Sequence, residues 1–126
     1  MCEKIQMWLA DIVSTGKYDI ITLDYCGGCF GNYCVVIQSN KSKIGMQIQI
    51  IKDRDILYCS VRNKFGSWIP IEKVFEYFRI EPLVFPVLDE EYFKYICEII
   101  LRYENILDNM VKKYKKAHRG QWCVLS

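Results

Sequence analysis

Residues 43–68 constrain the fold more than any other stretch, because hydrophobic and polar residues alternate there over two consecutive segments. In the first segment Ile44, Met46, Ile48 and Ile50 share one side of an extended chain, opposite Gly45, Gln47 and Gln49. In the second, Leu57, Cys59 and Val61 lie opposite Tyr58, Ser60 and Arg62. A period of two is typical of a strand with one buried and one solvated face. The polar residues between the segments therefore predict a β-hairpin with a short charged turn.

Two further strands are predicted before this hairpin, over residues 18–25 and 33–39. The glycine-rich residues 26–32 join them and favour a tight turn. The second strand is almost wholly apolar as far as Ile37, so we expect it to be central and covered on both faces. Four consecutive strands with short connections favour an antiparallel meander.

Helical periodicity accounts for the remainder of the chain. Residues 2–14 carry one apolar stripe, and a short helix is predicted from Pro70, which suits the first helical position. The prolines of residues 81–86 favour an extended segment. We expect Asp89 to be the N-cap of a long helix with a basic end, which Asn105 and its neighbours could kink or split. The predicted fold is α+β, a four-stranded antiparallel meander flanked by an N-terminal helix and two C-terminal helices, in a single domain over residues 1–126.

The composition bounds the function. A chain of 126 residues with 52% hydrophobic and 25% charged residues can form one soluble domain with its own core. A net charge of +2 is too small to make nucleic acid the main partner. The chain has seven cysteines, and an odd number would leave one unpaired in a disulfide framework. We expect neither a signal peptide nor a membrane span, which requires roughly 18 apolar residues. These features predict a cytoplasmic protein with free thiols, most of them small core hydrophobes.

The sequence offers few groups for chemistry. Cys26 and Cys29 form a CxxC, but a glycine-rich turn follows where a redox motif would have a helix N-terminus. A structural zinc site needs four ligands, and His118 is the only histidine. The glycines at 27, 28 and 31 lack the GK[ST] ending of a phosphate loop, and His118 has no evident partner as a general base. We predict no metal, no cofactor and no catalysis, with a small thiol enzyme as a rival hypothesis.

The C-terminus suggests an alternative function. The sequence Cys123-Val124-Leu125-Ser126 fits a C-a-a-X prenylation box, resembles the tails of Ras-type GTPases, and follows a basic run at residues 112–119. Lipidation of Cys123 would make the protein a membrane-targeted effector or adaptor in a eukaryotic cell. The competing interpretation is a basic helix end that complements the helix dipole, followed by a tail that folds back on the domain.

Residues 30–78 contain a series of short motifs. Phe30-Gly31 enters a strand, Ile50 and Asp53-Arg54-Asp55 precede the next strand, and Trp68 precedes a helix. In these motifs the chain resembles small bacterial immunity proteins of polymorphic toxin systems. This resemblance implies a protein that neutralises a cognate toxin domain by direct, stoichiometric binding.

Such a binding protein needs a rigid scaffold and a few aromatic or charged anchors on its surface. Tyr58 and Arg62 on the outer face of the hairpin, with Asp53 and Arg54 in its turn, are candidate partner-binding residues. The acids at the start of the long helix are further candidates, namely Asp89, Glu90 and Glu91. The apolar stripe of the C-terminal helix could alternatively support a homodimer.

Overall fold

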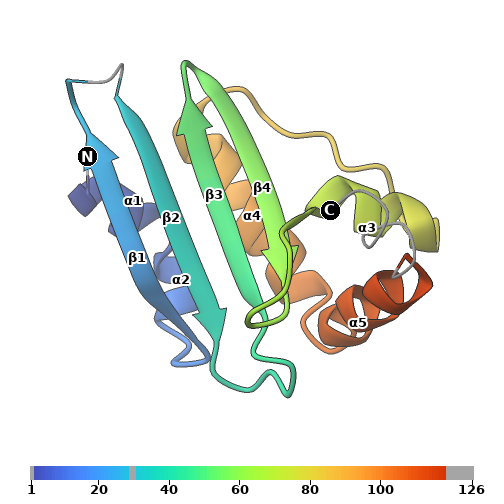
Figure 1. Cartoon of the computed structure of the whole chain (residues 1–126). Helices are drawn as coiled ribbons and strands as arrows, with labels where there is room; N and C mark the ends of the chain where they lie inside the picture. The colour runs from blue at the N-terminus through green and yellow to red at the C-terminus, as the bar shows by residue number, and fades with distance from the viewer. Residues whose placement is uncertain (1, 29–30, 119–126) are drawn as a thin grey trace.

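The computed structural model describes residues 2–28 and 31–118. Its strands form one antiparallel sheet in the order β1-β2-β3-β4-β5 (Figure 1). The strands are β1 (Tyr18–Cys26), β2 (Asn32–Ser39), β3 (Gln47–Asp53), β4 (Ile56–Arg62) and β5 (Ile69–Pro70). The α+β class and the meander are confirmed. The predicted number of strands is wrong, because the two residues of β5 pair with Ser60 and Val61 and add a fifth strand.

Both long helical predictions break into shorter helices. The helices are α1 (Cys2–Trp8), α2 (Ala10–Val13), α3 (Ile71–Phe78), α4 (Asp89–Arg102) and α5 (Leu107–Ala117). The predicted N-terminal helix is divided at Leu9, and the long C-terminal helix ends at Arg102 before α5 begins. Three helices therefore follow the sheet in place of the predicted two. Tyr103 and Ile106 lie in the turn between α4 and α5, at the place where Asn105 marked a kink or a split.

The helices α1, α2 and α4 lie behind one face of the sheet, and α3 and α5 lie to the side of β4 that is away from β3 (Figure 1). No helix or strand of residues 2–28 and 31–118 covers the other face. The prediction that β2 is covered on both faces is therefore wrong. Val36 is only 7% exposed on the uncovered side, since Thr22 and Gln49 flank it in the strand register.

Buried side chains from the strands and all five helices form one core cluster. Ile5 and Ile12 come from the N-terminal helices, and Ile96 and Val111 come from α4 and α5. The apolar stripe of the C-terminal helices is thus packed within this chain. Association of two copies through that stripe stays a prediction.

The start of α4 differs from the sequence prediction. Leu88 occupies the N-cap position, with no side-chain cap hydrogen bond, and Asp89 is the first helical residue. The Asp89 carboxylate instead accepts hydrogen bonds from Tyr33 and Lys52. An acid in the first turn still favours the helix dipole. Asp89 therefore joins α4 to the sheet.

The thiols follow the prediction in part. Cys2, Cys34, Cys59 and Cys97 are free, and the last two are buried in the core. Cys26 is disulfide-bonded, so the prediction of free thiols is wrong at that position.

Candidate functional site

The uncovered side of the sheet presents side chains in rows, because residues paired directly across antiparallel strands point to the same face. The strand register gives three rows: Asp24, Cys34, Ile51 and Tyr58; Thr22, Val36, Gln49 and Ser60; Asp19, Gln38, Gln47 and Arg62. We call these twelve residues the open face. Apolar and aromatic side chains lie in the first two rows, and the third row is polar.

Arg62 is held firmly at the polar end of the open face. Its Nε–H donates to Oε1 of Gln47 (2.9 Å), and the Gln47 amide donates in turn to Gln38 (3.0 Å). Its Nη1 donates to the carbonyl oxygen of Gly66 (3.5 Å), and its guanidinium carbon lies 4.1 Å from the centre of the Trp68 ring. None of the ion pairs within the described residues includes Arg62. A guanidinium carries five N–H donors, so this one is oriented and still has donors to offer.

The loop after β4 carries a residue that the sequence analysis missed. Phe65 is 91% exposed and has a φ of 68°. The loop around it is fixed, since Lys64 N–H donates to Ile44 O (3.0 Å) and Lys115 Nζ donates to Asn63 Oδ1 (2.9 Å). The Phe65 ring has Lys64 Nζ above it at 5.4 Å from the ring centre. A left-handed backbone at a bulky, solvated residue costs free energy, and such positions are typical of functional sites.

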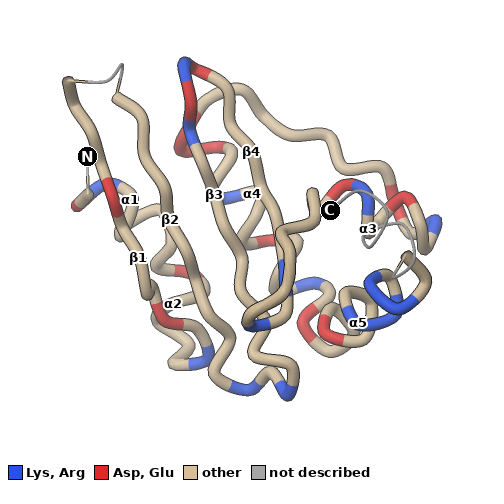
Figure 2. Tube along the Cα trace, in the orientation of Figure 1, with Lys and Arg blue, Asp and Glu red and all other residues tan. Residues whose placement is uncertain are grey.

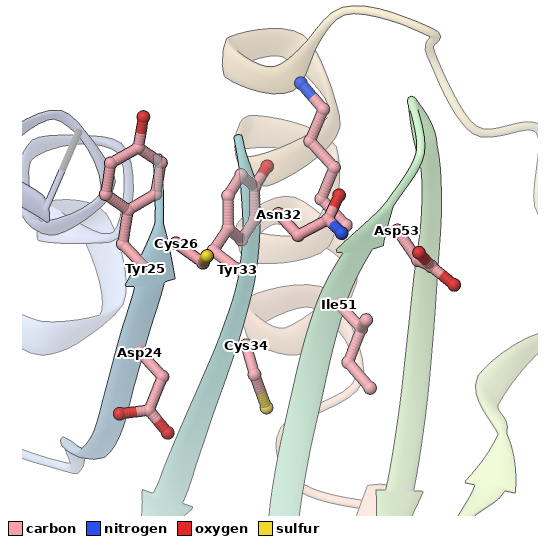
Figure 3. A pocket seen from close by; sticks show the side chains of 9 residues that line it. Asp24, Tyr25, Cys26, Asn32, Tyr33, Cys34, Ile51 and Asp53 are labelled. Carbon is pink, nitrogen blue, oxygen red and sulfur yellow. The ribbon is translucent and has the colours of Figure 1, made fainter. Parts of the chain in front are cut away.

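The opposite end of the open face borders a shallow pocket of about 430 Å³ between the two hairpins (Figure 3). Asp24, Cys34 and Ile51 point to one side of the sheet there, and Tyr58 continues their row and is half exposed. Burial raises the pKa of the Cys34 thiol, Gln49 opposes this by hydrogen bonding, and the charge of Asp24 raises it further. The thiol is therefore protonated at neutral pH and is not an activated nucleophile.

The turn of the β3–β4 hairpin has Arg54 and Asp55 at φ values of 52° and 69°. Positive φ at both central residues matches the twist of a two-residue hairpin turn. The Arg54 amide donates to Oδ1 of Asn32 (2.9 Å), which ties this turn to the start of β2. Asp53 is exposed and lines the pocket.

The structure separates the predicted partner-binding residues into two groups. Tyr58 and Arg62 lie on the open face, and Asp53 and Arg54 lie at its edge. The acids of α4 lie on the helix-covered side. Asp89 accepts from the Tyr33 hydroxyl (2.8 Å) and from Lys52 (3.2 Å), Glu90 lies 3.4 Å from Lys94, and Glu91 is exposed. Burial, then the hydrogen bond and charge of Asp89, raise the pKa of Tyr33 well above its usual range. The Asp89 carboxylate is thus engaged within the chain.

Charge is unevenly spread over the molecule. Lysines concentrate on α5 and acids in the first turn of α4, whereas both signs of charge meet at the β3–β4 turn (Figure 2). The His118 ring stacks on Tyr114 with ring centres 4.1 Å apart.

No group of three or more metal-ligating acids, cysteines or histidines occurs in the described part of the chain. Among the same residues, no helix is long and apolar enough to cross a membrane.

Cys29, Phe30, Cys123 and the rest of the C-a-a-X box lie outside the described residues. The lipidation of Cys123 stays a prediction. Comparison with protein-family models, with curated proteins and with solved structures gives no match.

Proposed function

We propose that this chain is a bacterial, cytoplasmic immunity protein that neutralises a cognate toxin domain by direct, stoichiometric binding through its open face, without catalysis. The observation that carries the proposal is the oriented Arg62 on a sheet face that no described element covers. The motif resemblance of residues 30–78 supplies the class of partner.

Arg62 has the features of an interface anchor. Binding hot spots are enriched in arginine, tryptophan and tyrosine, and a side chain that is already ordered loses little entropy on association. Gln47, Gly66 and Trp68 order the guanidinium before any partner arrives. A carboxylate of the toxin would therefore accept hydrogen bonds from guanidinium N–H groups of Arg62 that are already in a fixed position.

Aromatic side chains lie in the same strand and the loop that follows it. Tyr58 is exposed on the open face, and Phe65 is exposed just after β4. A standard interface buries roughly 800 Å² per partner around a few such anchors. The open face and the Phe65 loop, which follows β4 directly, provide exposed aromatic side chains of this kind.

The proposal is tested with the toxin domain encoded next to this gene. The two purified proteins should form a 1:1 complex that abolishes the toxic activity. In calorimetry, Arg62→Ala should weaken the complex about thirtyfold or more, as expected for a hot spot worth about 2 kcal/mol. Arg102→Ala, the same change at an exposed arginine of α4, and Glu91→Ala on the helix-covered side are the controls.

No complex with the adjacent toxin domain would overturn the proposed function. A tight complex that Arg62→Ala leaves unchanged would retain the function and reject the open face as the binding surface. A larger loss from Glu91→Ala than from Arg62→Ala would move the interface to the side of α4.

A further inference from the structure

We propose that the toxin domain presents an acidic surface to this chain, and that its carboxylates bind a cluster of cations where β4 ends. The inference rests on the proposed function and names the chemistry of the partner. Residues 62–68, which we call the basic loop, include no aspartate or glutamate. Arg62 and Lys64 belong to the basic loop, and Lys115 reaches it from α5.

Two of these cations lie against the same residue of the basic loop. The Lys115 ammonium donates to Asn63 Oδ1 (2.9 Å), and a Cβ added at Gly66 would lie 2.7 Å from the same Nζ atom. Arg62 Nη1 donates to the carbonyl oxygen of Gly66 (3.5 Å). The ammonium and the guanidinium groups are therefore both held beside Gly66, one from α5 and one from β4.

The cations of the basic loop are oriented without being neutralised. Within residues 2–28 and 31–118, no ion pair includes Arg62, Lys64 or Lys115. The amide and carbonyl oxygens that accept from Arg62 and Lys115 are neutral groups. Like charges held close together repel each other, and carboxylates from another molecule would relieve that repulsion.

The β2–β3 loop extends the positive surface. The Lys64 amide donates to the carbonyl oxygen of Ile44 (3.0 Å), and a Cβ at Gly45 would lie 2.8 Å from the Lys64 Cβ, so the two loops are in contact. The β2–β3 loop also lacks acids, and its Lys41 and Lys43 are exposed (Figure 2). The net charge of +2 is thus unevenly distributed, with an excess of cations where these two loops meet.

Phe65 supplies an apolar anchor beside the cations. Its side chain is 91% exposed, and Lys64 Nζ lies 5.4 Å from the centre of its ring. Well-packed apolar anchors and arginines dominate the energetics of protein interfaces, and a guanidinium group matches the geometry of a carboxylate. The complementary partner surface is therefore an apolar depression bordered by aspartate or glutamate side chains.

A polynucleotide fits this surface less well than an acidic protein does. Single-stranded nucleic acid binds along a continuous basic groove, because every nucleotide carries a phosphate. Glu104 and Asp108 line a pocket together with Lys41 and Lys43, so carboxylates border the cations of the β2–β3 loop. A compact basic patch with acids at its border favours a few carboxylates of a protein surface over a phosphate backbone.

The test measures how fast this protein associates with the toxin domain encoded next to its gene, by stopped-flow fluorescence. Complementary charges raise the association rate constant, and salt screens them. The rate constant should therefore fall at least about tenfold between about 50 mM and about 500 mM NaCl. Lys64→Glu should lower it at least about fivefold at about 50 mM NaCl, because a charge at an interface rim acts chiefly on association.

Lys4→Glu is the matched control. Lys4 is exposed on α1, which lies on the helix-covered side of the sheet, and the two variants have the same net charge. Lys4→Glu should change the rate constant by less than about twofold under the same conditions, because its distance from the basic loop screens it. If Lys64→Glu does not fold, as judged by circular dichroism, the salt dependence of the unaltered protein decides.

The possible outcomes separate this inference from the proposed function. A complex whose association rate does not depend on salt would overturn the inference and retain the function, as would equal effects of Lys64→Glu and Lys4→Glu. No complex at any salt concentration would overturn both. A fluorescein-labelled oligouridylate of about twelve nucleotides that binds more tightly than the toxin domain, and that Lys64→Glu releases, would overturn the inference by identifying a nucleic-acid site.

Discussion

Replacing Asp89 by alanine should destabilise the protein far more than the same change at the next residue, Glu90. Both acids belong to the first turn of α4, so both lose the same favourable interaction with the helix dipole. Asp89 additionally holds Tyr33 and Lys52, whereas Glu90 contacts Lys94 across one helical turn at the surface. The difference between the two variants therefore isolates the Tyr33–Asp89–Lys52 network.

The expected magnitude follows from the burial of each partner. Tyr33 is 3% exposed, and losing a charged acceptor for its hydroxyl should cost about 1.5–3 kcal/mol. The Lys52 and Asp89 side chains are 18% and 23% exposed, so solvent screens their ion pair in part and we assign it about 1 kcal/mol. Asp89→Ala should thus cost about 3 kcal/mol in total. Glu90→Ala should cost about 0.5 kcal/mol or less, since its pair is more than half exposed.

Urea unfolding monitored by circular dichroism measures both values. With a slope of about 2 kcal/mol per M, Asp89→Ala should lower the midpoint by about 1.5 M and leave the slope unchanged. A double-mutant cycle with Tyr33→Phe should give a coupling of about 1–2 kcal/mol. A loss for Asp89→Ala within about 0.5 kcal/mol of that for Glu90→Ala would refute this reasoning, because the network would then contribute nothing beyond the dipole.

Two further predictions concern backbone conformation and pH. Gly16 and Gly45 both have positive φ, but a Cβ at Gly45 would lie 2.8 Å from Cβ of Lys64, whereas a Cβ at Gly16 meets no atom within 4 Å. In urea unfolding, Gly16→Ala should therefore cost about 1 kcal/mol and Gly45→Ala at least about 1 kcal/mol more; equal costs would contradict the contact. Burial is the main cause that raises the pKa of the Cys97 thiol from 9.0 to about 12 in the folded protein. As the pH rises, the unfolded chain therefore loses this proton before the folded chain does. The free energy of unfolding then falls above a pH of about 9. Between pH 7 and pH 10 this thiol should remove about 1.4 kcal/mol from the free energy of unfolding, and Cys97→Ala should show a decrease smaller by that amount; an identical decrease in both proteins would contradict the assignment.

The hairpin is the part of the fold that the sequence predicted best. Alternation over β3 and β4 identified the two faces because those preferences are local, and Ile48 and Val61 pair in the core as expected. Gln47 is the exception, since it belongs to the predicted solvated face and is only 5% exposed. The apolar run of β2 misled the prediction, since sheet neighbours shield Val36 where no second layer is present. The break between α4 and α5 was only partly visible, because the apolar spacing continues through Ile106.

The candidate sites were harder to predict because they are assembled from distant segments. Tyr58 and Arg62 could be placed on one strand face from their spacing. The orientation of Arg62 depends on Gln47 from the neighbouring strand and on Trp68 beyond the following loop. A pocket of about 390 Å³ likewise brings Lys43 of the β2–β3 loop to Glu104, some sixty residues later in the chain. No local pattern encodes such proximity.

The position of β1 at the end of the strand order has a consequence for solubility. A nine-residue outer strand offers unpaired amide and carbonyl groups to any other extended chain, which is the first step of edge-to-edge aggregation. An irregularity in the register between Ile20 and Thr22 interrupts that border, and the exposed carboxylates of Asp19 and Asp24 lie along it. Two copies that paired along β1 would bring these like charges together. The carboxylates therefore oppose edge-to-edge aggregation at the first strand of the meander.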